Sequence, residues 1–179
     1  MNNFYQLLFE YRPLEGGYFV KGIVSDSLSV DVTVPSIHNG KPVVGVGEYA
    51  FDGNYRLVRI VLPSTIRKIC ANAFSFCLNL KEVVLPPELE VLAVGVFLRC
   101  ANLSKINLPK NLKKICQMAL FGAGLDEVVI PSATTEILPE ALPSRAILRA
   151  LPGTYGEVYA RRHGFRFQPL RRSYFKKNK

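Results

Sequence analysis

Residues 57–77, 80–100 and 103–123 read LVRIVLPSTIRKICANAFSFC, LKEVVLPPELEVLAVGVFLRC and LSKINLPKNLKKICQMALFGA. The three segments share one pattern, in which a proline stands six residues after an opening leucine. Four such prolines, Pro63, Pro86, Pro109 and Pro131, follow one another at spacings of 23, 23 and 22 residues. A repeat of this length cannot bury its apolar face alone and must stack on its copies. The sequence therefore predicts a solenoid, a fold that offers a long surface and usually no pocket.

Each repeat is expected to carry one short strand. Apolar residues stand six, three and one positions before each proline, and we expect the last two to point into the core. The proline ends the strand because it has no N–H for a further ladder bond. Asn79, Asn102 and Gly124 precede the opening leucine, and we expect left-handed turns there because both residue types tolerate that backbone. Another recurring position is expected to form one buried column: Phe51, Phe74, Phe97 and Leu120.

The chain divides into one domain and a tail. The domain is expected to span residues 1–168, with an N-terminal capping hairpin at 4–28, repeats at 29–142 and a C-terminal cap at 143–168. Caps are needed because the end coils of a solenoid otherwise expose apolar surface and unpaired strand edges. Residues 169–179 are a basic tail.

Both caps have recognisable turn and helix signals. Residues 12–17 supply the turn of the N-terminal hairpin. In the C-terminal cap, Thr154 and Glu157 have the spacing of a capping box, and Gly164 follows the expected helix end. A short strand is expected at 165–167.

The recurring residues resemble the BspA-like leucine-rich repeats. The segments 80–86 (LKEVVLP) and 73–80 (AFSFCLNL) carry the resemblance, which departs from the family pattern at Leu120 and in the one-residue deletion around Ala123 and Gly124. The resemblance implies a right-handed, β-rich leucine-rich-repeat solenoid with ~23-residue coils and parallel short strands. It also implies a non-catalytic recognition or adhesion module, often secreted by host-associated bacteria and found at the cell surface.

Composition sets the broad class of the protein. Hydrophobic residues make up 49% of the chain, too many for a disordered chain, and no apolar run is long enough to span a membrane. The first residues lack a signal-peptide pattern, so the chain as written predicts a cytoplasmic protein, against the secretion that the resemblance implies. The net charge of +9 comes almost wholly from residues 160–179, which contain no acidic residue.

The four cysteines are expected to be reduced. Cys70 and Cys116 lie two coils apart, at roughly 10 Å, which exceeds the bridging limit of about 7 Å. Cys77 and Cys100 lie on adjacent coils and come within reach of one another, but a small buried filler is the favoured role. No pattern of cysteine and histidine suggests zinc.

Nothing in the sequence indicates an enzyme. The chain has two histidines, His38 in an inserted turn and His163 at a helix end, and it lacks the common nucleotide-binding and hydrolase motifs. We expect no catalytic residue, no metal site and no cofactor.

The outward positions of the predicted strands are the first candidate surface. Four positions before the prolines, the charge alternates from coil to coil, so cross-strand pairing is expected to fix the register and keep the surface soluble. The same face remains a candidate for binding an unknown protein partner by a monomer, because valines recur two positions before the prolines. The charge column begins at Asp31, and the candidate residues are Arg59, Val61, Glu82, Val84, Lys105, Asn107, Glu127 and Val129.

The basic C-terminal end is the alternative. Cations interleaved with aromatic residues can bind phosphates or an anionic surface, although no nucleic-acid-binding fold accompanies them. The candidate anion-binding residues are Arg161, Arg162, Arg166, Arg171 and Arg172.

Overall fold

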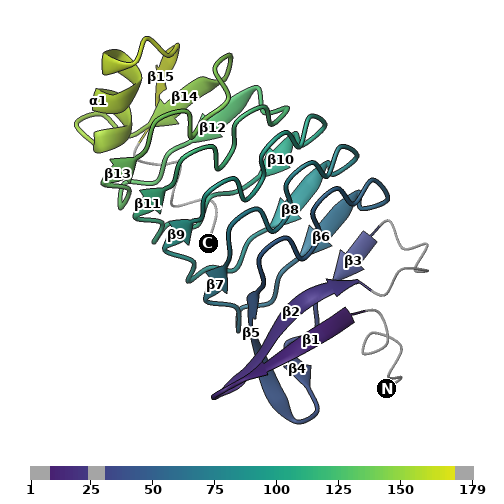
Figure 1. Ribbon diagram of the computed structural model, residues 1–179. Coiled ribbons are helices and arrows are strands. Elements are labelled where there is room, and N and C mark those ends of the chain that lie inside the picture. Colours follow the sequence, from purple (N-terminus) through teal and green to yellow (C-terminus); the bar gives the residue numbers. More distant parts are fainter. Residues whose placement is uncertain (1–8, 24–30, 172–179) are drawn as a thin grey trace.

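The computed structural model describes residues 9–23 and 31–171. Figure 1 shows a solenoid with two columns of short strands running side by side, the hairpin β1–β2 at one end and the helix α1 at the other. The first column consists of β3 (Asp31–Thr33), β6 (Arg59–Val61), β8 (Glu82–Val84), β10 (Lys105–Ile106), β12 (Glu127–Val129) and β14 (Ile147–Ala150). The second column consists of β5 (Lys41–Val46), β7 (Lys68–Ile69), β9 (Val91–Leu92), β11 (Lys114–Ile115) and β13 (Glu136–Ile137). The parallel, stacked strands confirm the predicted solenoid and place the first column at the predicted strand positions.

Each column is interrupted once. In the first column, β3, β6, β8 and β10 form one sheet, whereas β12 and β14 form another with β15 (Phe167–Pro169). In the second column, β5 pairs with β7 and β9 pairs with β11 and β13, but β7 does not pair with β9. The interruption in the first column coincides with the repeat of 22 residues, and the one in the second column lies within repeats of regular length.

The N-terminal end contains two hairpins where the sequence predicted one. β1 (Phe9–Leu14) and β2 (Gly17–Ile23) are antiparallel, so the strands extend through most of the segment expected to turn, and only Glu15 and Gly16 remain for the turn. The inserted turn is a second hairpin, in which β4 (Ile37–His38) pairs with β5. Residues 4–8 and 24–28 of the predicted cap lie outside the described residues.

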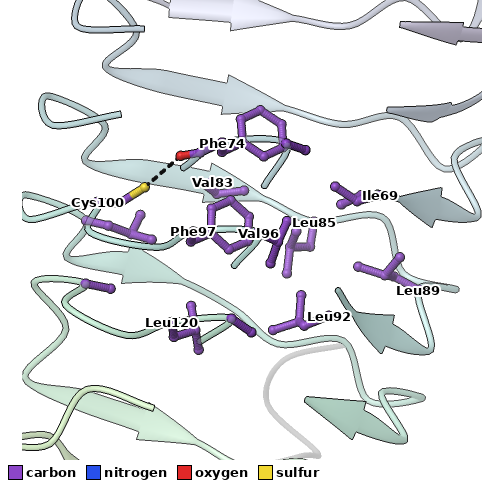
Figure 2. Packing of buried hydrophobic residues seen from close by; sticks show 14 of the residues in the cluster. Ile69, Phe74, Val83, Leu85, Leu89, Leu92, Val96, Phe97, Cys100 and Leu120 are labelled. Carbon is purple, nitrogen blue, oxygen red and sulfur yellow. Dashed lines mark hydrogen bonds between the residues drawn. The ribbon is translucent and has the colours of Figure 1, made fainter. Parts of the chain in front are cut away.

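A column of aromatic rings forms the centre of the core. Phe51 stacks on Phe74 with ring centroids 4.9 Å apart, and Phe74 stacks on Phe97 at 5.4 Å. Leu120 continues the column and is fully buried (Figure 2). The predicted column is therefore confirmed.

The buried cysteines stack in the same way as the rings. The Cys77 thiol donates to the Phe51 carbonyl and the Cys100 thiol to the Phe74 carbonyl, each at 3.0 Å (Figure 2 shows the second bond). All four cysteines are free thiols, as predicted. The thiols therefore satisfy backbone carbonyls between coils instead of forming a cross-link.

The predicted left-handed turns are wrong. None of Asn79, Asn102 and Gly124 has a positive φ. The two asparagine side chains instead donate to backbone carbonyls of the preceding coil, at 2.7 and 2.8 Å. Gly124 is required for close approach, because a Cβ there would lie 2.2 Å from the Ala101 carbonyl oxygen. Left-handed backbone occurs nine and thirteen residues after the prolines, at positions that include bulky side chains: Asn72, Phe76, Gly95, Arg99, Met118 and Gly122.

The C-terminal cap covers the last coil. α1 (Tyr155–Arg162) packs closely at Gly156, where a Cβ would lie 2.9 Å from Ile130 and Ala150 side-chain atoms. Gly164 has a φ of 71°, as expected after the helix end. No described helix has the length and apolar character needed to cross a bilayer.

Two details of this cap differ from expectation. The predicted capping box does not form, because Glu157 accepts from the N–H of Gly153, one residue before the N-cap Thr154, and the Thr154 hydroxyl donates to the Leu151 carbonyl. The last strand lies at Phe167–Pro169 rather than at 165–167, and the Leu170 that follows it is buried.

Candidate functional site

The outward surface of β6, β8 and β10, here called the ladder face, carries a chain of ion pairs. Glu82 lies between two cations, 3.3 Å from Arg59 Nε and 2.9 Å from Lys105 Nζ. The hydrogen bond from Lys105, followed by the charges of Lys105 and Arg59, holds the pKa of Glu82 below its ordinary value. The strands are in register, with Glu82 opposite both cations, so the predicted alternation is confirmed over these three coils.

The predicted pairing of charges on neighbouring coils is wrong beyond Lys105. Glu127 bonds to Arg149 of β14, with 3.0 Å between Oε2 and Nη1. Within residues 9–23 and 31–171, no ion pair joins Lys105 to Glu127. The physical reason is the break between β10 and β12, because a cross-strand pair needs strands that are hydrogen-bonded neighbours.

The valine positions differ in exposure. Val84 is 37% exposed, whereas Val61 and Val129 are half-buried. In the coil between those of Val84 and Val129, the same position is occupied by the exposed Asn107. Val129 belongs to β12, which is not paired with β10. The ladder face is thus a short, mostly polar surface with an exposed valine near its centre.

The basic end is partly committed to internal contacts. Arg161 Nη2 lies 2.8 Å from Glu157 Oε1, and its guanidinium lies 5.9 Å from the Phe167 ring centroid. Arg162, Arg166 and Arg171 are exposed. The fifth residue of this set, Arg172, lies outside the described residues.

Sequence reasoning missed a hollow on the second strand column. Two hollows of about 580 and 680 Å³ adjoin one another, and both are lined by Glu48, Lys68 and Cys70. Together they are called the groove. The expectation that a solenoid lacks pockets therefore does not hold here. The available sequence signal was the run of small residues seven positions after the prolines, where Cys70 is followed by Ala93 in the next coil.

The two histidines are packed against aromatic rings. His38 stacks on Tyr11 with ring centroids 3.8 Å apart, and His163 stacks on Tyr159 at 4.2 Å. Burial raises the pKa of Tyr11 to about 12, so this phenol is neutral at physiological pH. In the part of the chain that the structure describes, no group of three or more His, Cys, Asp or Glu residues could hold a metal ion.

The architecture and its surfaces define a leucine-rich-repeat solenoid. The sequence profile of the BspA-type leucine-rich repeat region matches residues 25–146 with six copies. The chain belongs to this family.

Solved structures agree with this assignment. A leucine-rich repeat protein of T. pallidum is 31% identical, with a TM-score of 0.74 over 79% of this chain and 68% of that one. A leucine-rich repeat protein of Bacteroides ovatus is 28% identical, with a TM-score of 0.75 over 84% of this chain and 42% of that one. The chain therefore spans less than half the length of the second protein. No curated protein matches the chain in sequence.

Proposed function

We propose that the protein is a non-catalytic recognition module that binds a protein partner, as a monomer, through the ladder face. The observation that carries this proposal is the chain of ion pairs from Arg59 through Glu82 to Lys105 on three strands in register. A surface held in one arrangement before binding loses little conformational freedom on binding. Membership of a leucine-rich-repeat family supports the same class of function.

Affinity and orientation are assigned to different residues. Val84 is the exposed apolar residue of β8, and Glu82 of the same strand is bonded to cations on both sides. Charges that already have partners set the rate and orientation of association more than its affinity, so the apolar contact supplies affinity. Adhesion at a cell surface is one form that this recognition takes in the proposal.

The test replaces Val84. The protein is immobilised, partners are captured from extract, and the affinity of each purified partner is measured for three forms of the protein. Val84→Glu should abolish binding, whereas Val84→Thr should retain most of it, because Thr33 occupies the equivalent position in β3. Both variants should melt close to the wild-type midpoint, since the side chain is exposed. Unaltered affinity of Val84→Glu would sink the proposal.

The second candidate is binding of nucleic acid or another anionic surface by the basic end. It is favoured by Arg162, Arg166 and Arg171, which are exposed and form no ion pair within the described residues. In the same capture experiment, nuclease-sensitive and salt-sensitive capture would support this alternative. The appropriate variant combines Arg162→Gln, Arg166→Gln and Arg171→Gln, because it removes the exposed charges and keeps the buried Leu170.

A further inference from the structure

The groove runs along the solenoid axis from the N-terminal hairpin to β9. The first hollow is lined by Arg12 of β1 and Lys21 of β2, and the second by Glu90 and Val91 beside or within β9. β2, β5 and β7 are hydrogen-bonded neighbours in that order (Figure 1). The residues that line the two hollows lie on or beside these strands and β9, so the hollows follow one another across the strands. The second hollow lies where β7 and β9 fail to pair. It thus coincides with the interruption of the second strand column.

The charges of the groove are separated along its length. The hairpin end carries the cations Arg12 and Lys21, whereas the β9 end carries the carboxylates Glu88 and Glu90. Lys21 and Glu90 form ion pairs with residues outside the groove, but the side chains of both pairs are more than half exposed. Exposed ion pairs contribute little stability, so a ligand charge can compete for either residue. Arg67 also lines the second hollow but is outnumbered there by the two carboxylates, so the groove has an excess of positive charge at the hairpin end and of negative charge at the β9 end.

The middle of the groove combines apolar surface with two opposite charges, because Glu48 and Lys68 line both hollows. Tyr49 is 59% exposed and Val91 is 41% exposed, which is high for large apolar side chains in a folded domain. Cys70 and Ala71 lie between them and are half-buried. Burial raises the pKa of the Cys70 thiol, which keeps it neutral at physiological pH. Between the two ends, a ligand therefore meets exposed apolar side chains beside the opposite charges of Glu48 and Lys68.

We propose that the groove binds a short extended peptide with an apolar middle, an acidic residue near one end and a basic residue near the other. The acidic residue lies at Arg12 and Lys21, and the basic residue at Glu88 and Glu90. Three strand-to-strand steps of about 4.8 Å separate β2 from β9, a span that about four residues of extended chain cover. Each hollow, at about 580 and 680 Å³, is in the size range of known ligand sites. This surface is distinct from the ladder face and does not depend on the function proposed for it.

The probes are fluorescein-labelled peptides measured by fluorescence anisotropy. The two test peptides are Glu-Val-Leu-Val-Lys and its reverse Lys-Val-Leu-Val-Glu, because the chain direction in the groove is open to either order. The control peptide is Val-Glu-Leu-Lys-Val, which has the same composition without charged ends. One test peptide should bind at least about tenfold more tightly than the control.

Two variants alter the groove while respecting the repeat. Residues 68 and 91 both stand five positions after a repeat proline. Lys68→Glu introduces the glutamate found at this position as Glu136, and Val91→Lys introduces the lysine found there as Lys68 and Lys114. Each variant should lower the affinity for the tighter peptide by about tenfold. Lys68→Glu repels the acidic residue of the peptide, and Val91→Lys removes apolar contact. Val84→Glu, which alters the ladder face, should bind this peptide as the wild type does. This control separates the proposal for the groove from the proposal for the ladder face, because Val84→Glu changes only the ladder face.

The thiols report the location of the peptide. Cys70 lines the groove, and Cys116 occupies the equivalent position two coils away, with the same half-burial and a thiol pKa also raised by burial. A saturating amount of the tighter peptide should slow alkylation of Cys70 by N-ethylmaleimide and leave Cys116 unchanged. Equal affinity for the control peptide, unchanged labelling of Cys70, or loss of binding in Val84→Glu would each overturn the proposal.

Discussion

Replacing Phe97 with alanine removes one ring from the centre of the core. Phe97 is fully buried, stacks on Phe74 and precedes the fully buried Leu120 in the column. Truncation deletes six carbon atoms, worth roughly 5 kcal/mol at about 0.8 kcal/mol each, near the top of the range of about 3–5 kcal/mol for buried Phe→Ala changes. The neighbours above and below belong to coils held by ladder bonds, so they cannot collapse fully into the space. We therefore expect a loss of about 3–5 kcal/mol.

Phe97→Leu is the matched control. Leucine stands at the equivalent position of the next coil, as Leu120, and is fully buried there. The change removes three carbon atoms and the ring stacking, so a loss of about 2–3 kcal/mol is expected. Phe74→Ala should cost at least as much as Phe97→Ala, because Phe74 stacks on two rings.

Urea titration followed by far-UV circular dichroism measures these losses. The chain has no tryptophan, so tyrosine fluorescence serves as the second probe, and coincident transitions verify two-state unfolding. A loss below about 1 kcal/mol for Phe97→Ala would contradict the stacking argument. Equal losses for Phe97→Ala and Phe97→Leu would contradict it as well. Should the alanine variant not fold, the leucine variant still supplies a measurable transition.

Two further predictions concern the thiols and the C-terminal helix. Alkylation under denaturing, non-reducing conditions should label all four cysteines, since all are free in the fold, and a two-label product would indicate a Cys77–Cys100 bond. The Gly153 N–H, followed by Arg161, holds the pKa of Glu157 below its ordinary value, so its stabilising effect is present above about pH 4.3 and is lost as the pH falls through the lowered pKa. Glu157→Gln should therefore melt at a lower temperature than the wild type at pH 7, and the difference should shrink as the pH is lowered below about 4.3; a difference that stays constant at all acidic pH values would refute this assignment.

The repeat, the caps and the aromatic column could be predicted from sequence because each depends on residue type at recurring positions. The prolines mark where each strand of the first column ends, and the spacing of Phe51, Phe74 and Phe97 places their rings on successive coils. Alternating charge likewise predicted the pairs that Glu82 makes, since neighbouring coils of equal length keep the same register. These features follow from a period of 23 residues and from the burial of apolar side chains.

The tertiary structure alone decided how neighbouring coils meet. A deletion near Gly124 shows in the sequence, but only the stacked coils reveal that Glu127 then bonds to Arg149. The groove likewise joins Arg12 of the hairpin to Lys68 and Val91 of two separate coils. Periodicity determines which side chains face outward. Whether adjacent strands remain hydrogen-bonded, and what surface they enclose, depends on small offsets between packed coils that no single repeat records.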